Sequence, residues 1–130
     1  MNVSEELIRS IVEKVIAETA AASNKCGFQK QVDPSGVIGV KTSTVELEPF
    51  EGRSDVKLKD VATLEEAPRM GCGIMELSDG ADFEWTLTYD EWDIVLEGRL
   101  EIKIDGRVVG GDAGDVIYIP KGSHIHFSTP

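Results

Sequence analysis

Most of this chain consists of short runs of β-branched and aromatic residues that are separated by Gly, Pro and Asp turns. The pattern begins after Gly39, and short strands at such spacing are typical of a β-sandwich or β-barrel. We therefore predict an all-β fold, with one hairpin at Asp105-Gly106, a pair that favours a type I′ turn. The candidate strands are 40–50, 73–77, 83–88, 92–96, 100–104, 107–109, 116–119 and 125–128.

In the first 22 residues, the apolar side chains recur at a helical spacing rather than at the alternating spacing of strands. This spacing places them on one helical face, which predicts an amphipathic α-helix over 1–22. Two interpretations stay open, since the stripe can pack on the barrel or a second subunit, or dock in the groove of a partner. The stripe consists of Leu7, Ile8, Ile11, Val12, Val15 and Ile16.

Residues 23–39 are predicted to be a linker between this helix and a barrel that occupies residues 40–130. The segment contains the turn-forming run Asp33-Pro34-Ser35-Gly36 and shows no sustained hydrophobic period. Such composition favours turns over regular structure.

The composition narrows the expected partners and compartment. The 130 residues suit one domain, and their 24 acidic and 13 basic side chains leave a formal charge of -11. That charge repels nucleic-acid phosphates and anionic membranes, so we expect neither as a partner. Cys26 and Cys72 lack metal-ligand spacing, which favours reduced thiols. Because the start is acidic and no apolar run reaches the length of a membrane span, we expect a cytoplasmic protein.

Two spaced motifs lie in the second half of the chain. Six residues separate Glu91 from Gly98, and Gly114 is followed after five residues by Pro120 and Gly122. Both motifs resemble those of the cupins, which are small β-barrels. The resemblance implies a cupin-type jelly roll preceded by the N-terminal helix.

The usual metal ligands of the cupin motifs do not carry over. The two histidine positions before Glu91 are occupied by Trp85 and Leu87, or, with the longer spacing, by Glu84 and Thr86. The histidine position of the second motif is Ile125. One carboxylate does not make a site for a transition metal, so we expect no such metal.

His124 and His126 flank Ile125, which occupies the histidine position of the second motif. Strand alternation places them on the opposite face from Ile125, which favours two solvent-facing histidines. The alternative is a bulge that turns one of them inward and recruits Glu84 into an irregular metal site.

A finer likeness lies in residues 85–93 (Trp-Thr-Leu-Thr-Tyr-Asp-Glu-Trp-Asp) and 119–123 (Ile-Pro-Lys-Gly-Ser). These runs resemble the EutQ branch of the cupins, the ethanolamine utilization proteins associated with bacterial microcompartments. In that setting the N-terminal helix is similar to peptides that recruit cargo to a shell. The resemblance also implies a homodimer, and microcompartment shell or cargo proteins as partners of the helix.

The sequence ends soon after the second motif, at Pro130. A cupin barrel needs at least one further strand after that motif. We therefore expect either that the barrel lacks its last C-terminal strands or that a partner covers its open edge.

If Glu91 faces the barrel interior, period-two alternation turns Asp93 and Tyr89 toward the same side. Trp85, Leu87 and Val95 are expected on that side too. Two neighbouring carboxyl groups repel when both are charged, which raises one pKa and suits an acid or base catalyst. The alternative is a structural pair that organises the barrel mouth.

The EutQ resemblance implies acetate kinase activity, the exchange of a phosphoryl group between acetyl phosphate and ATP, with Mg²⁺ and ATP as cofactors. The candidate catalytic residues are Glu91, Asp93, Tyr89 and Lys121, and the candidate cofactor-binding residues are Trp85 and Arg99. Phosphoryl transfer needs positive charge around the phosphates, which Mg²⁺, Lys121 and Arg99 could supply. The chain has no phosphate-binding glycine loop. The alternative hypothesis is a non-catalytic assembly or adaptor protein with a metal-free pocket.

Overall fold

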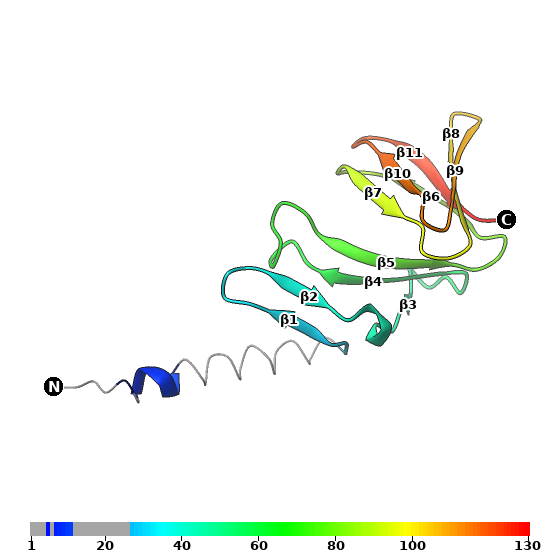
Figure 1. The fold of residues 1–130 in the computed structure, drawn as a ribbon. Coiled ribbons are helices and arrows are strands. Elements are labelled where there is room, and N and C mark those ends of the chain that lie inside the picture. Colours follow the sequence, from blue (N-terminus) through cyan, green and yellow to red (C-terminus); the bar gives the residue numbers. More distant parts are fainter. Residues whose placement is uncertain (1–4, 6, 12–26) are drawn as a thin grey trace. The chain divides into compact units, whose positions relative to one another are not determined.

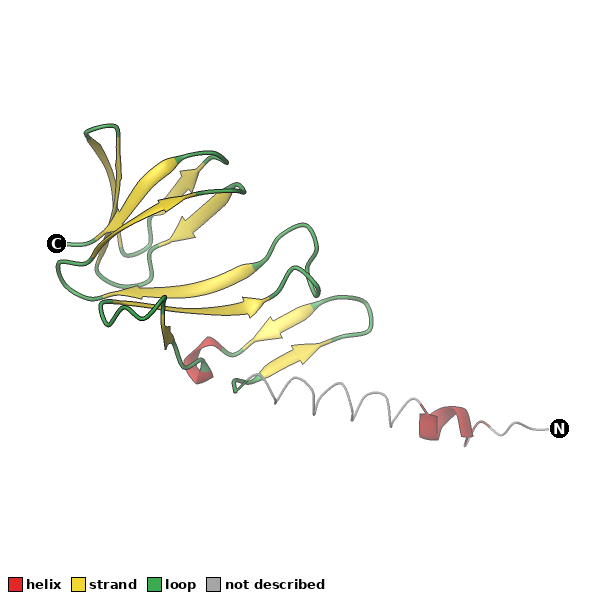
Figure 2. Ribbon diagram, turned by 180° about the vertical axis from the view of Figure 1, so that it is seen from behind, coloured by secondary structure: helices red, strands yellow, loops and turns green. Residues whose placement is uncertain are grey.

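The computed structural model describes residues 5, 7–11 and 27–130, and the described chain is mostly β-strand (Figure 1, Figure 2). Residues 5 and 7–11 are helical, which confirms a helix near the N-terminus; the rest of the predicted helix over 1–22 lies outside the described residues. The chain divides into two compact units. One contains the described part of 1–48 together with 58–74, and the other contains 49–57 and 75–130.

The prediction of a linker over residues 23–39 is corrected by a hairpin in the first unit. Strands β1 (Lys30–Val32) and β2 (Ile38–Val40) pair antiparallel, with Val32 opposite Ile38. The turn forms because Asp33 Oδ2 accepts the Ser35 N–H at 2.8 Å and Asp33 O accepts the Gly36 N–H at 2.9 Å. The turn formers therefore connect two short strands.

The predicted strand over 40–50 is wrong in its extent. After β2 the chain forms a 3₁₀ turn at Thr42–Thr44, and β3 covers only Glu48–Pro49. The Thr44 hydroxyl accepts the Gln29 N–H at 2.9 Å and donates to Lys41 O at 2.7 Å, so side-chain bonds replace a strand ladder. Strands β3, β4 (Val56–Ala62) and β5 (Cys72–Leu77) form a sheet in that order, and β4 was missed in the sequence.

The second unit contains two further sheets. Four strands pair in the order β6-β11-β8-β9, and β7 pairs with β10. The last strand of the chain, β11, therefore lies between two neighbours. The expectation that further C-terminal strands follow stays a prediction. The bounds are β6 Asp82–Thr86, β7 Glu91–Ile94, β8 Arg99–Ile104, β9 Arg107–Asp112, β10 Val116–Ile119 and β11 His124–Ser128.

The predicted hairpin between β8 and β9 is confirmed. Asp105 and Gly106 have φ angles of 50° and 74°, as the two central residues of a type I′ turn require. In the ladder that follows, Ile104 lies opposite Arg107 and Ile102 opposite Val109. The two-residue turn thus sets the register of the pair.

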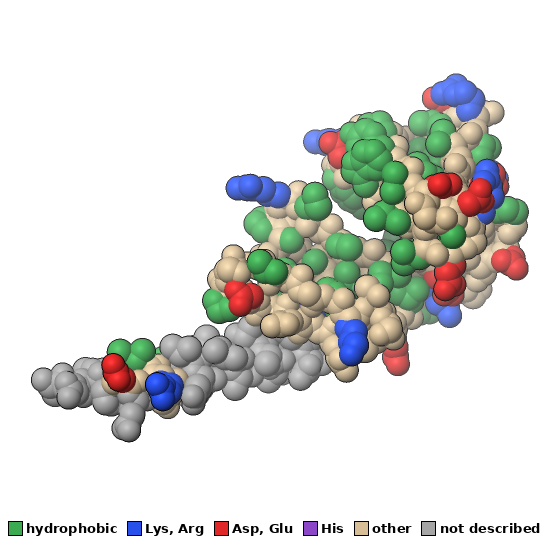
Figure 3. Space-filling view, in the orientation of Figure 1, with side chains coloured by type: hydrophobic (Ala, Val, Ile, Leu, Met, Phe, Trp, Pro, Cys, Tyr) green, Lys and Arg blue, Asp and Glu red, His purple; other side chains and the backbone are tan. Residues whose placement is uncertain are grey.

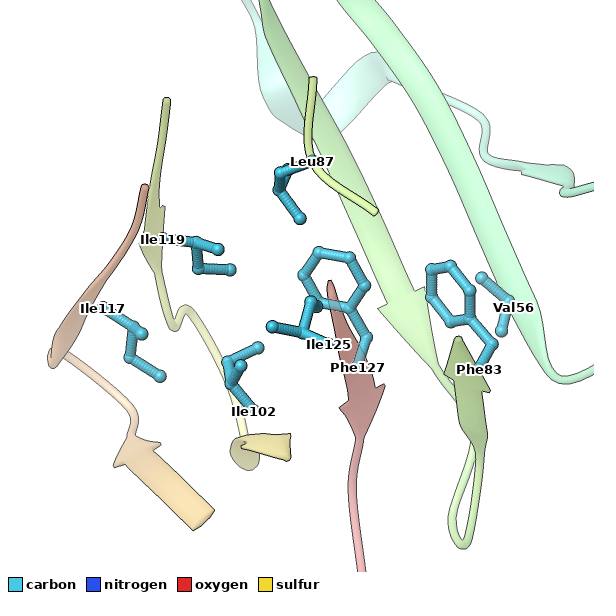
Figure 4. Packing of buried hydrophobic residues seen from close by; sticks show 8 residues of the cluster. All are labelled: Val56, Phe83, Leu87, Ile102, Ile117, Ile119, Ile125 and Phe127. Atoms are coloured by element: carbon cyan, nitrogen blue, oxygen red, sulfur yellow. The ribbon is translucent and has the colours of Figure 1, made fainter. Parts of the chain in front are cut away.

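The core of the second unit is built from alternate residues of its strands (Figure 4). On β6 and β11, Phe83 lies opposite Phe127, and their rings stack with centroids 5.1 Å apart. Burial of these apolar side chains is the main force that holds the strands together. The cluster contains Val56, Phe83, Leu87, Ile102, Ile117, Ile119, Ile125 and Phe127.

Candidate functional site

The candidate carboxyl pair lies on β7. Glu91 and Asp93 are half-buried, whereas Trp92 and Ile94 between and after them are 67% and 65% exposed. Alternation along the strand explains this difference, because successive side chains point to opposite faces. The prediction that Glu91 and Asp93 share one face is therefore confirmed, and Leu87 and Val95 are buried as expected.

The neighbouring strand gives the pair an apolar setting. Glu91 lies opposite Ile119 and Asp93 opposite Ile117, and both isoleucines are buried. Partial burial and the charge of Asp93 raise the pKa of Glu91 to about 7, and a hydrogen bond with Asp93 adds to the rise. Burial also raises the pKa of Asp93, while the hydrogen bond from Glu91 opposes that rise.

These shifts indicate that the two carboxyl groups share a proton near neutral pH. When both are ionised, the pair contains only acceptors, and the buried Asp93 Oδ2 has no hydrogen-bond partner within the described chain. A proton on Glu91 supplies a donor to Asp93. The pair can thus act as one acid or one base close to pH 7.

Tyr89 lies at the exposed edge of the Glu91–Asp93 pair. The phenol donates a hydrogen bond to Glu91, which lowers the pKa of that carboxyl and partly offsets its rise. The Tyr89 side chain is 53% exposed, so it lies at the edge of the inner face, although the alternation pattern placed it inside. The change of direction between β6 and β7 explains the difference, because residues 87–90 leave the strand geometry.

Lys121 is held by Asp90, which precedes the pair in the sequence. The Lys121 backbone N–H donates to Asp90 Oδ1 at 2.8 Å, and the Tyr118 hydroxyl donates to the same carboxylate. These bonds, together with the Lys121 charge, lower the pKa of Asp90. Lys121 is thus tied to Asp90 through its backbone N–H.

Trp85 and Arg99 lie on different elements. The half-buried Trp85 ring packs against Phe50 and Phe83, with centroids 5.5 and 6.3 Å away. Arg99, at the start of β8, pairs with Asp112 at 3.1 Å and with Glu101 at 3.6 Å. Their contacts give no sign of a shared nucleotide site, and the cofactor-binding role of each stays a prediction.

The two histidines lie on the face of β11 that is turned away from the core, as the alternation pattern predicts. Ile125 between them is buried. His124 Nε2 lies 2.5 Å from Glu84 Oε1, and His126 Nδ1 lies 2.6 Å from Asp82 Oδ1. Within the described part of the chain, no group of three or more His, Cys, Asp or Glu residues is placed to hold a metal ion.

A shallow depression lies beside these histidines rather than over the carboxyl pair. Asp82 and Lys103, which the sequence did not single out, contribute to it. They were missed because only strand pairing brings β6, β11 and β8 together at this place. The depression is lined by Asp82, Lys103, Ile104, Asp105, Gly106, His124 and His126.

The fold defines the class of protein. The chain superimposes on the cupin domain of Cnp3 from Schizosaccharomyces pombe with a TM-score of 0.58 and 17% identity, covering 70% of this chain and 63% of that one. At such low identity the likeness concerns the fold alone, and that fold is a cupin. The prediction of a cupin-type β-barrel is confirmed.

The sequence defines the family within that class. A family model described as ethanolamine utilisation protein EutQ matches residues 3–130, and the chain belongs to this family. Acetate kinase EutQ of Clostridioides difficile is 44% identical over 135 residues, which cover 99% of this chain and 83% of the relative. Acetate kinase EutQ of Salmonella typhimurium is 37% identical, and the match covers 98% of this chain and 57% of that protein.

A solved structure of a relative agrees with this assignment. The Clostridium difficile EutQ protein superimposes with a TM-score of 0.71 and 46% identity, covering 80% of this chain and 86% of that one. The predicted resemblance to EutQ proteins is therefore confirmed. As for membranes, the helical segment that the structure describes is too short to cross one.

Proposed function

We propose that this ethanolamine utilization protein has acetate kinase activity and exchanges a phosphoryl group between acetyl phosphate and ATP. The names of the relatives at 44% and 37% identity suggest the reaction. The observation that carries the site is the half-buried Glu91–Asp93 pair, because the pKa of Glu91 is raised to about 7. A carboxyl group with such a pKa is partly ionised at neutral pH, and the ionised form can serve as an oxygen ligand for Mg²⁺ beside the transferred phosphoryl group.

The phosphoryl transfer itself moves no proton, so in this proposal Glu91 serves in its ionised form, and Asp93 and Tyr89 hold its carboxyl group in place. The oxygen donors of the pair also fit Mg²⁺, which prefers carboxylates, and Asp93 Oδ2 lacks another partner among the described residues. Mg²⁺, when bound, would neutralise charge on the phosphates. Lys121 would face the incoming anion from the Pro120–Gly122 turn, where its side chain is exposed.

The test is ATP formation by purified protein supplied with acetyl phosphate, ADP and Mg²⁺. Glu91→Gln keeps the shape of the carboxyl group but removes its negative charge and one oxygen ligand suited to Mg²⁺, so we expect a loss of about 100-fold or more. Glu97→Gln, at an exposed position after the same strand, is the matched control and should keep full activity. Wild-type activity in Glu91→Gln would remove Glu91 from the mechanism.

A second candidate function is that of a microcompartment adaptor that acts through the N-terminal helix. The supporting observation is that Leu7, Ile8 and Ile11 are all more than half exposed at helical spacing. An apolar stripe of this kind fits the groove of a shell or cargo protein. The protein would then be cytoplasmic and held at the microcompartment.

Deletion of residues 1–22 separates the two functions. If the helix recruits the protein, the deletion should release it from shell fractions, while circular dichroism still reports a folded β-structure. Replacing Leu7, Ile8 and Ile11 by Ser in the full chain should have the same effect, because it removes three of the six apolar side chains of the stripe and leaves the length of the chain unchanged. Unchanged co-sedimentation of both variants would exclude the helix as the recruiting element.

The outer face of β7 and β10 supports the expected homodimer. Trp92 lies opposite Tyr118 and Ile94 opposite Val116, so one half of the face is aromatic and the other aliphatic. Figure 3 shows hydrophobic side chains gathered over these strands. Two copies could meet face to face about a twofold axis that runs parallel to the face and across the strands. The aromatic half of one copy would then lie on the aliphatic half of the other. We propose a second copy as the partner, because an uncharged face avoids repulsion between two chains of charge -11.

A further inference from the structure

The depression on the outer face of β6, β11 and β8 contains a histidine that carboxylate and lysine partners orient. Asp82 Oδ1 lies 2.6 Å from His126 Nδ1, and Asp82 Oδ2 accepts a hydrogen bond from Lys103 Nζ at 2.7 Å. These two bonds lower the pKa of Asp82, that from Lys103 being the larger cause. Asp82 therefore stays ionised and accepts the proton of His126 Nδ1–H.

This bond leaves the other ring nitrogen of His126 available. With the proton on Nδ1, the neutral ring carries its lone pair on Nε2. No hydrogen bond or ion pair from residues 27–130 engages His126 Nε2, and the residue lines the depression. A carboxylate on one ring nitrogen fixes the tautomer and makes the opposite nitrogen a stronger base and nucleophile.

His124 provides a contrast on the same strand. Its Nδ1 lies 2.9 Å from Thr86 Oγ1 and its Nε2 lies 2.5 Å from Glu84 Oε1. Both ring nitrogens are thus engaged by the neighbouring strand. Of the two imidazoles, only that of His126 presents a nitrogen to an incoming molecule.

The acidic groups around His126 are engaged by other side chains. Glu84, which lies opposite His126 on β6, is bonded to His124. The carboxylate of Asp82 is paired with Lys103 at 2.7 Å, and that of Asp105 with Arg107 at 3.6 Å. Each acidic group that lines the depression therefore has a cationic partner. Lysine is a common point-charge contact for phosphates, and Lys103 lines the depression.

We propose that this depression binds small acyl phosphates and that His126 Nε2 accepts their phosphoryl group. The Nε2 lone pair forms a bond to phosphorus, the bond from phosphorus to the acyl oxygen breaks, and the carboxylate leaves with the bonding electrons. The proton stays on Nδ1, and the ionised Asp82 stabilises the positive charge that the ring gains. The choice of acyl phosphates rests on the proposed acetate kinase activity, whereas the accepting residue is separate from Glu91, which lies on β7 in a different sheet.

The experiment uses the full chain and acetyl phosphate labelled in its phosphoryl group, without nucleotide. We expect an acid-labile, base-stable label on one histidine, located at His126 by peptide mass spectrometry. His126→Gln should abolish the label. Asp82→Asn should slow labelling about tenfold or more, because an amide can stabilise the wrong tautomer of the ring.

Two control variants make the outcome decisive. His124→Gln should keep the label, since His124 offers no available nitrogen, and Glu91→Gln should keep it while losing ATP formation. An unlabelled wild-type protein, or a label that persists in His126→Gln, would overturn the inference. Either result would leave the acetate kinase proposal standing, because ATP formation is measured separately.

Discussion

At the scale of single residues, the molecule places its acidic groups in two kinds of surroundings. Cationic partners keep two carboxylates ionised and lower the pKa of each: Asp82 on the outer face of β6 and Asp55 in the turn before β4. On the inner face, burial beside Ile117 and Ile119 raises the pKa values of Glu91 and Asp93. The same functional group thus serves charge pairing in one place and proton exchange in the other.

The raised pKa of Glu91 predicts a particular dependence of stability on pH. Between its ordinary value of 4.5 and about 7, the folded protein holds a proton that the unfolded chain has lost. The free energy of unfolding should therefore fall by roughly 1–3 kcal/mol as the pH rises through this window. The stabilising contribution is complete below pH 4.5 and absent above pH 7.

Urea unfolding of the wild type and of Glu91→Gln at several pH values measures this effect. Subtracting the two curves isolates the titration of the coupled Glu91–Asp93 pair, because the lowered pKa values of Asp55 and Asp82 affect stability only at more acidic pH. The variant should lose most of the decline, keeping only the part that burial of Asp93 causes, whereas Glu97→Gln should retain all of it. Parallel curves for wild type and Glu91→Gln would show that Glu91 has no raised pKa.

At the scale of elements, short turns decide which strands meet. The two-residue turn between β8 and β9 fixes their register, and β11 then pairs with β8 on one side and β6 on the other. This pairing brings Lys103 within reach of Asp82, 21 positions away in the sequence. The geometry of the depression therefore depends on the hairpin.

The turn itself can be tested at Gly106. A Cβ at this position would meet no atom within 4 Å, so Gly106→Ala probes the positive φ of 74° alone. We expect the substitution to cost about 1 kcal/mol of stability, measured by urea unfolding. Gly106→Asn is the matched control and should cost less, because Asn adopts this conformation more readily than Ala. Equal effects of both substitutions would show that the positive φ is not the source of the cost.

At the scale of the whole molecule, the surface combines a strong negative charge with an uncharged apolar face. Scattered exposed apolar residues are ordinary, but Trp92, Ile94, Val116 and Tyr118 are contiguous on two paired strands. A charge of -11 opposes self-association elsewhere. The apolar face is thus the place where two copies would meet at the lowest electrostatic cost.

The proposed dimer predicts a change in mass in solution. Ile94→Asp should shift the protein from dimer to monomer in sedimentation or light-scattering measurements, because it buries an unpaired charge in the contact. Added salt should strengthen the wild-type dimer by screening repulsion. Val37→Asp is the matched control, since Val37 is exposed to a similar degree, 69% against 65%, on the β1–β2 hairpin. A wild-type monomer would exclude this contact.

The sequence by itself determined the features that depend on local order along the chain. Alternation on β7 and β11 predicted which residues face the core, the Asp105-Gly106 pair predicted the hairpin, and the spaced motifs predicted the cupin class. These features follow from neighbouring residues, because side-chain direction and turn geometry are set within a few positions.

Only the tertiary structure decided what depends on residues far apart in the chain. The β1–β2 hairpin within the predicted linker, the commitment of Arg99 to Asp112, and the Asp82–His126–Lys103 group arise from strand pairing. A sequence does not state which strands are neighbours, since pairing is chosen by the combined burial of the core. Alternation along one strand could therefore predict the inner Glu91–Asp93 pair and the outward direction of His126. It could not predict that Asp82 and Lys103 are the partners of His126 and of each other, because these residues lie on other strands.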